Sequence, residues 1–209
     1  MNTMTHEQRA WRNLIEDPLG FVSPEHVHAA LGDWISASDM VKLRKHPRFD
    51  GRLLQQLISH FRLQPLALIE QPDALDLPVL VLSPEAFSGL PRLCGALWHA
   101  PTLSREIRGD VVSELRRLLG NDAFALALAN REVGGAANLL RQPAELLEVI
   151  DRDGAACVSA WLRAQPSPLR DWLRLRFADP QVDDLQVPGD LNIVRIAAGH
   201  LVQPAEEVA

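Results

Sequence analysis

Hydrophobic residues in the middle of the chain recur at helical spacing. Between Leu103 and Leu119 an apolar side chain returns every three or four positions, and charged side chains fill the intervals. This pattern predicts one amphipathic helix. Gly120 is placed to end it, and Asn121 is placed to cap the next helix. The residues expected on its buried face are Leu103, Ile107, Val111, Leu115 and Leu118.

Helices are also predicted on both sides of this segment. The stripe formed by Leu90, Leu93 and Leu97 stops at Pro101, and Phe124 lies among alanines that favour close packing. Short connections between such helices usually produce antiparallel neighbours. The predicted core of the protein comprises Leu97, Ile107, Val111, Leu115, Leu118, Phe124, Trp161, Leu173 and Phe177.

Caps, prolines and glycines mark further short helices along the chain. Thr5 and Gln8 have the spacing of a capping box, and Ser23-Pro24 restarts a helix after the break at residues 17–20. Asp50 is a candidate cap as well. The other expected helices are Thr5–Glu16, 24–31, Ser38–Lys45, Gly51–Phe61, Ala136–Arg141, Pro143–Ile150, Gly154–Ala164, Leu169–Phe177 and Leu191–Leu201.

The segment from Gln64 to Pro84 differs because four prolines punctuate it. It contains the strand-like run Val79–Leu82. This run is either a short strand or part of an extended connector packed on the helices. We favour the connector, since a single strand needs a partner.

These patterns predict an all-α fold, a single compact domain of about eight to ten short helices. The 209 residues suit one domain. Leucine is frequent and tyrosine absent, which favours helices over strands. Within the domain we expect a helical part at 1–63, a connector at 64–84, a helical core at 85–201 and a frayed tail at 202–209.

Charge and composition narrow the classes of function. The formal charge of −6 argues against nucleic-acid binding, which calls for a basic surface. The N-terminus lacks an apolar signal core, and no apolar run of about 18 residues predicts a membrane span. Cys94 and Cys157 lie on apolar helix faces and are expected to be buried, reduced thiols. We therefore expect a cytoplasmic protein without direct membrane insertion.

The sequence offers no motif for catalysis, a metal or a cofactor. His26 and His28 are the one close pair of histidines, but residues two apart point to different sides of a helix. Neither an HExxH zinc motif, a GxSxG nucleophile elbow nor a phosphate-binding GxxxxGK[ST] loop is present. We therefore expect a protein that is not an enzyme.

Two groups of arginines are the candidate functional residues. Arg170 and Arg174 are four residues apart and share a helical face, and Arg108 and Arg116 belong to a second local set. The simpler interpretation is a solvated surface, with internal salt bridges to acidic neighbours such as Glu106 and Glu114. The alternative is docking to an acidic partner, since arginine is enriched at protein interfaces.

The chain resembles the type III secretion sorting-platform accessory family, the SctK or YscK type. The resemblance spans roughly Leu90 to Pro180. It lies in the segments LPRLCGALWHAPTLSREI, RRLLGNDAFALALA and AWLRAQPSPLRDWLRLRF. It implies a non-enzymatic, cytoplasmic adaptor without a cofactor. Its implied partners are the cytoplasmic domain of the inner-membrane ring protein and the pod protein of the sorting platform.

Two other classes of function remain open at this stage. One is an enzyme with an unrecognised site around Cys94, His99 and Glu106, three reactive residue types that lie close in the sequence. The other is a regulatory module that binds a protein, or nucleic acid through the arginines near Arg170. A structure that buries the three side chains without a cleft would argue against the enzyme.

Overall fold

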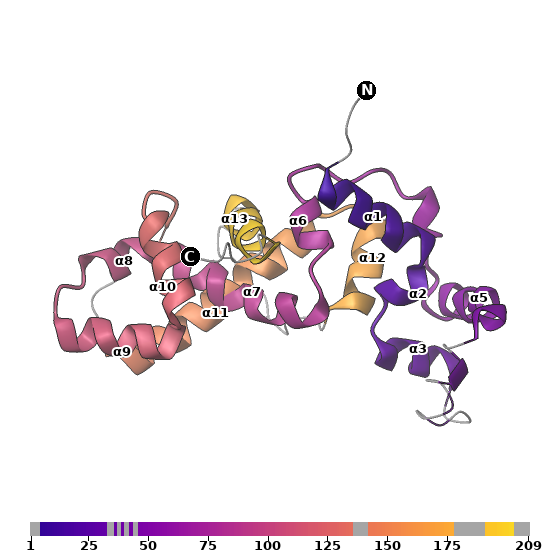
Figure 1. Ribbon diagram of the computed structural model, residues 1–209, viewed down its shortest axis with the longest axis horizontal. Helices are drawn as coiled ribbons and strands as arrows, with labels where there is room; N and C mark the ends of the chain where they lie inside the picture. The colour runs from indigo at the N-terminus through magenta and orange to yellow at the C-terminus, as the bar shows by residue number, and fades with distance from the viewer. Residues whose placement is uncertain are drawn as a thin grey trace, which may run out of the picture. The chain divides into compact units, whose positions relative to one another are not determined.

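The computed structural model describes residues 5–32, 36, 39, 42, 43, 46–135, 142–177 and 191–202. Every regular element in these residues is a helix, which confirms the all-α prediction (Figure 1). Contacts divide the chain into two compact units. Unit 1 is Met1–Pro84 with Gln165–Ala178, and unit 2 is Glu85–Ala164 with Asp179–Ala209. The expectation of one domain stays a prediction.

The helices of the two units are mostly short. Unit 1 contains α1 (His6–Glu16), α2 (Pro18–Phe21), α3 (Pro24–Leu31), α5 (Asp50–Phe61), α6 (Leu77–Leu80) and α12 (Ser167–Arg176), with 3₁₀ turns at Pro47–Phe49 and Leu66–Leu68. Unit 2 contains α7 (Pro84–Trp98), α8 (Ala100–Arg105), α9 (Gly109–Leu119), α10 (Asn121–Ala129), α11 (Pro143–Ala164) and α13 (Leu191–Val202).

Local sequence signals start and stop several of these helices as predicted. The Thr5 hydroxyl accepts the backbone N–H of Gln8 at 3.3 Å, and the Gln8 side chain accepts that of Thr5 at 3.0 Å. This reciprocal pair is the predicted capping box. Gly120 ends α9 with a φ of 87°, a left-handed conformation that glycine adopts without steric cost.

An aromatic cluster forms the centre of unit 1. The Phe21 ring meets Trp11 and Trp172 edge to face, each with ring centroids 6.3 Å apart. The Trp172 indole also donates a hydrogen bond to the Gln64 carbonyl at 2.7 Å. The cluster thus joins α1, α2 and α12, and all three rings are at least 94% buried.

Arg176, at the end of α12, is buried beside this cluster. Its guanidinium donates hydrogen bonds to the backbone carbonyls of Phe21, at 3.2 Å, and of Leu82. Its central carbon also lies 4.7 Å from the centroid of the Phe21 ring, in cation–π geometry. One side chain therefore ties α12 to α2 and to the segment that follows α6.

Glycines set the close approach of α7 and α11 in unit 2. A Cβ on Gly95 would lie 1.9 Å from the Ile150 carbonyl oxygen, and one on Gly154 would lie 1.8 Å from that of Pro91. Both separations are far below van der Waals contact, so neither position has room for a side chain. Around this contact α11 also packs on α9 and α13, and α10 packs on α8 and α9.

The predicted central helix is wrong in one respect. It is divided at residues 106–108, where the backbone is extended, so that α8 ends at Arg105 and α9 begins at Gly109. Ile107 lies in this break and is 89% exposed, contrary to the prediction that it is buried. Val111 and Leu118 are half-buried. The other six predicted core residues are buried, as expected: Leu97, Leu115, Phe124, Trp161, Leu173 and Phe177.

Three other local expectations are corrected. Val79 and Leu80 belong to the short helix α6, so this part of the run is neither a strand nor the extended connector that we favoured. Residues 18–21 form α2 rather than a simple break. Gly154 lies inside a continuous α11 because it packs against α7, so the two helices predicted there are one. The expected helix Ala136–Arg141, most of Ser38–Lys45 and the tail after residue 202 lie outside the described residues.

Leu115→Ala and Ile107→Ala should separate the two kinds of position within the predicted stripe. Leu115 is 1% exposed, so its truncation should lower the free energy of unfolding by about 2–5 kcal/mol. Ile107 is exposed, and its truncation should change that free energy by less than about 0.5 kcal/mol. Urea unfolding of both variants measures this, and equal losses would contradict the observed break between α8 and α9.

Gly154→Ala should destabilise the protein, whereas Gly89→Ala should stabilise it. A methyl group at Gly154 would press on the backbone of α7, with an expected loss of about 1–3 kcal/mol from overpacking. A methyl group at Gly89, inside α7, would meet nothing within 4 Å. Alanine there should add about 0.5–1 kcal/mol through its helix propensity. Thermal unfolding distinguishes the two, and a stabilised Gly154→Ala would refute the close contact.

Candidate docking surfaces

The first arginine set lies on α12 in unit 1. The buried face of α12 carries Trp172 and Leu173, which hold the helix in the core. Arg174 is exposed and lies 3.9 Å from the Asp171 carboxylate, too far for a strong hydrogen bond. Arg170 is half-buried. The structure therefore makes Arg174 the more accessible of the two candidates.

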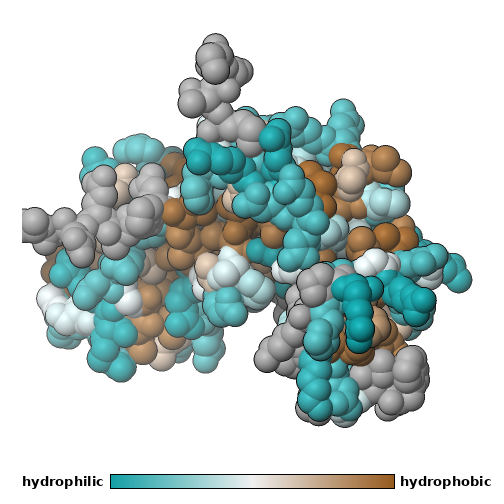
Figure 2. All heavy atoms as spheres, turned by 45° about the vertical axis from the view of Figure 1, so that its right-hand side comes forward, coloured by the Kyte–Doolittle hydropathy of each residue, from teal (hydrophilic) through white to brown (hydrophobic). Residues whose placement is uncertain are grey.

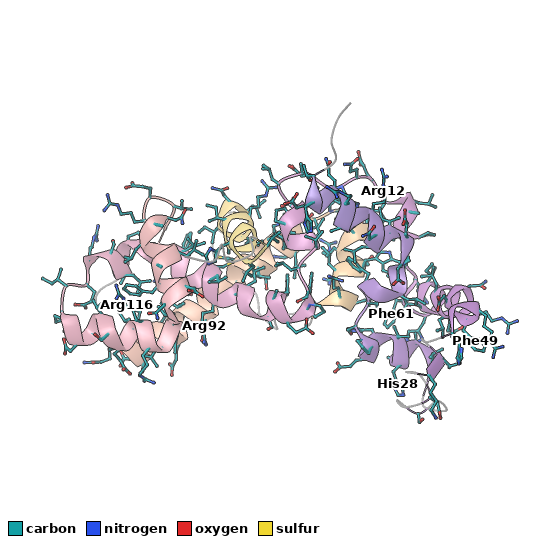
Figure 3. The ribbon with its side chains drawn as sticks, viewed as in Figure 1. Arg12, His28, Phe49, Phe61, Arg92 and Arg116 are labelled. Atoms are coloured by element: carbon teal, nitrogen blue, oxygen red, sulfur yellow. The ribbon has the colours of Figure 1, made fainter. Side chains whose placement is uncertain are left out.

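The second set lies at the two ends of α9 in unit 2. Arg116, labelled in Figure 3, places its guanidinium carbon 5.3 Å from the centroid of the Phe124 ring. Arg108 forms a two-point ion pair with Glu106, at 3.0 and 2.8 Å. Arg117 is similarly paired with Glu114. The internal salt bridges expected for a solvated surface are therefore present, and both candidate arginines have a neighbour within unit 2.

Glu106 forms a compact clamp with Arg108. Besides the guanidinium, its carboxylate accepts the backbone N–H of Arg108 at 2.9 Å, and its side chain is 3% exposed. Hydrogen bonds from the Arg108 side chain and then from its backbone lower the pKa of Glu106 to about 2. The carboxylate fixes the turn between α8 and α9, because it binds both the backbone and the side chain of Arg108, two residues further along the chain.

The three reactive side chains of the alternative enzyme site do not form an accessible constellation. Cys94 and His99 are fully buried, and burial raises the pKa of the Cys94 thiol well above its usual value, which makes it a poor nucleophile. The His99 Nε2 lies 2.8 Å from the Asp153 carboxylate, and Glu106 is held by Arg108. The geometry gives no support for catalysis by this trio.

The His99–Asp153 pair was not predicted, because its members are 54 residues apart and no local pattern links them. Asp153 also accepts two hydrogen bonds from Arg152, at 2.9 and 2.8 Å. The pair joins the end of α7 to α11 inside unit 2. The His99 side chain is fully buried and that of Asp153 is 9% exposed, which indicates a structural role, since buried polar groups are normally held by partners.

A search of the described residues finds no metal site and no membrane span. No group of three or more His, Cys, Asp or Glu side chains there is placed to hold a metal ion. None of the described helices is long and apolar enough to cross a membrane. Cys94 and Cys157 are both buried, free thiols, as predicted.

Unit 2 also has an open pocket of about 1270 Å³ that sequence reasoning missed. An exposed ion pair, Arg92 with Asp151 at 2.9 and 2.8 Å, lies on its wall, and Arg92 is labelled in Figure 3. The pocket is formed by α7, the α9–α10 corner, α11 and the end of α13. Residues from four separate segments meet there, so no local sequence signal could have found it.

Glu106→Gln should remove a pH-dependent contribution to stability. The carboxyl has a pKa of about 2 in the fold against an ordinary value of 4.5, so its contribution is present above about pH 4.5 and is lost as the pH falls through about 2. The difference in unfolding free energy between wild type and Glu106→Gln should therefore be largest near neutral pH and shrink toward pH 2.

Urea unfolding between pH 2 and 7 measures this difference. Glu148→Gln provides the matched control, because Glu148 is an exposed glutamate on α11. A Glu106→Gln difference that is independent of pH, or that grows on acidification, would contradict the clamp.

Comparison of the sequence with known proteins finds similarity to nodulation protein NolU. The chain is 28% identical over 159 residues to nodulation protein NolU of Rhizobium fredii. The aligned region covers 74% of this chain and 69% of the relative. Nodulation protein NolU of Sinorhizobium fredii matches to the same extent. No protein-family model matches the chain. No solved structure matches it significantly.

Proposed function

We propose that this chain is a non-enzymatic helical adaptor of a bacterial type III secretion system. It links the cytoplasmic domain of the inner-membrane ring protein to the pods of the sorting platform. The observation that carries this proposal is the presence of two compact helical units, each with its own arginine set. A two-sided adaptor needs two surfaces, because one patch cannot bind both partners at once.

The resemblance to the sorting-platform accessory family supports this proposal. The segments that resemble the sorting-platform accessory family form α7 with α8, the end of α9 with α10, and the end of α11 with α12. These helices carry most of the buried residues of unit 2 and the α12 anchor of unit 1. The relative named for nodulation matches about three quarters of the chain, 74%.

The adaptor acts in the cytoplasm, at the inner membrane, which it reaches through the ring protein. It binds no cofactor and no nucleic acid, and chemistry is left to other components of the apparatus. The formal charge of −6 agrees with protein partners rather than DNA, because DNA binding gains most of its affinity from neutralised phosphates.

Deletion of the gene tests the proposal directly. Secretion of type III substrates into the medium should stop, and the pod density beneath the basal body should be missing in tomograms of the bacterial envelope. A plasmid copy of the gene should restore both. Normal secretion by the deletion strain would refute the proposed function.

Reversing one arginine set should weaken one partner far more than the other. Arg170→Glu with Arg174→Glu reverses the half-buried and the exposed arginine of α12, and Arg108→Glu with Arg116→Glu reverses the arginines at the two ends of α9. Each double variant should slow association with a single partner and make it less sensitive to salt, as expected for charges at the rim of an interface. Binding kinetics with the purified ring-protein domain and the purified pod protein measure this.

The matched control is Arg9→Glu with Arg12→Glu, the same change of charge at two exposed arginines of α1. Unfolding is measured for each variant, because Arg108 also holds Glu106. Unchanged binding of both partners by both double variants would show that the arginines are only a solvated surface.

A further inference from the structure

Positive charge is concentrated in one segment of an otherwise acidic chain. Residues 42–62 contain six of the 21 lysines and arginines but one of the 27 acidic residues. Their formal charge is therefore +5, and since the whole chain carries −6, the remainder carries −11. Charge asymmetry of this kind is a signal for binding to a membrane surface or to a nucleic acid.

Helix α5 carries much of this segment on the surface of unit 1. Leu53 and Leu57 are buried and fix one face of α5 in the core, whereas Arg52, Gln55 and Ser59 are exposed. Figure 2 brings the right-hand side of Figure 1, where α5 lies, toward the viewer, and strongly hydrophilic residues gather on that part of the surface. No large hydrophobic side chain is exposed among the described residues of this segment.

Three exposed arginines, Arg48, Arg52 and Arg62, define the basic surface of α5. None of them forms an ion pair with a residue that the structure describes. Arg48 lies over the Phe49 ring, with its guanidinium carbon 4.7 Å from the ring centroid. Asp50 is the one carboxylate in this segment, and it is half-buried. Accessible positive charge therefore exceeds negative charge on this surface.

The residues around the basic surface of α5 keep this balance. His46 and His60, in the same segment, are exposed and can add positive charge but no negative charge. Helix α3 packs on α5 and adds one exposed carboxylate, Glu25, in its first turn. Lys42 is offset by Asp39, whose carboxylate lies 2.9 Å from the Lys42 ammonium. The surroundings thus leave the surface positive.

A bilayer fits the basic surface of α5 better than a folded protein does. One arginine precedes α5, one lies in its first turn and one follows its last residue, so the charge is spread along the helix. Protein interfaces usually have an apolar centre, which the exposed face of α5 lacks. Lipid headgroups need no such centre, because their phosphates rearrange in the plane of the bilayer to meet dispersed cations.

We propose that the basic surface of α5 binds the phosphate headgroups of an anionic membrane surface without inserting into it. The guanidinium group suits this role, since its planar fork of N–H donors pairs with phosphate oxygens. The inference goes beyond the proposed function and takes from it only the location at the inner membrane. An adaptor held there by another protein keeps α5 at a high effective concentration near the headgroups, so a weak contact is sufficient.

Co-sedimentation of the full-length chain with vesicles tests this assignment. At about 50 mM NaCl the chain should bind anionic vesicles of phosphatidylethanolamine and phosphatidylglycerol, and it should not bind neutral vesicles of phosphatidylcholine. Binding should fall steeply at about 300 mM NaCl, because salt screens exposed charges. Equal binding to both kinds of vesicle, or binding to neither, would overturn the inference.

Reversing two of the charges locates the contact. Arg48→Glu with Arg52→Glu should weaken binding to the anionic vesicles about 25-fold or more, since each basic residue near an anionic bilayer strengthens binding about fivefold. Arg48→Lys with Arg52→Lys should keep the affinity within about threefold, because the charge remains. The unfolding midpoints of both double variants should equal that of the wild type, since both arginines are exposed.

Arg9→Glu with Arg12→Glu is the matched control, the same change of net charge at two exposed arginines of α1. Its binding to the anionic vesicles should stay within about threefold of the wild type, because the basic surface of α5 is intact. An equal loss in the control and in the α5 variant would show that net charge governs binding, and the inference would be wrong.

The remaining outcomes separate lipid from other acidic partners and from the proposed function. If the α5 variant binds anionic vesicles like the wild type but loses the purified ring-protein domain or pod protein, the surface docks an acidic protein and the inference is refuted. Tighter binding of the wild type to duplex DNA than to the vesicles at the same salt would assign the surface to nucleic acid instead. Failure of vesicle binding leaves the adaptor function standing, whereas normal secretion by the deletion strain refutes only the adaptor function.

Discussion

The buried guanidinium of Arg176 organises unit 1. Placing a charge in a core is costly unless hydrogen bonds replace its water shell, and here the carbonyls of Phe21 and Leu82 accept them. These carbonyls are 155 and 94 residues away in the chain. The interaction explains why Gln165–Ala178 packs with the N-terminal segments, although it directly follows the longest helix of unit 2. Arg174 is displayed on unit 1 for the same reason.

In unit 2 the close packing of α7 and α11 depends instead on two glycines, which have no side chain. Gly95 and Gly154 allow α7 and α11 to approach until backbone meets backbone, and the buried pair of His99 with Asp153 joins the residue that follows α7 to α11. Around this rigid pair α9 and α10 can be short, since α11 and α8 hold them in place. The Glu106–Arg108 clamp then shapes the turn that carries Ile107.

Most candidate arginines already have a neighbour within their own unit. Arg108 is bound to Glu106, and Arg116 stacks on Phe124. An arginine that already interacts within its own chain adds modestly to the affinity for a partner, because binding the partner competes with that internal interaction. The candidate site of Cys94, His99 and Glu106 is not accessible for catalysis, because Cys94 and His99 are fully buried.

The sequence by itself determined the all-α class, most helix positions and much of the core. Those features depend on neighbours within one or two helical turns, as the capping pair of Thr5 and Gln8 shows. Tertiary structure decided the rest. The stripe that included Ile107 was correct in spacing, but a carboxylate clamp divided the helix and turned that residue to solvent. Gly154 resembled a break in the sequence and proved to be a contact with Pro91. Periodicity reports which residues share a face, whereas hydrogen bonds and close contacts between distant residues decide what that face meets.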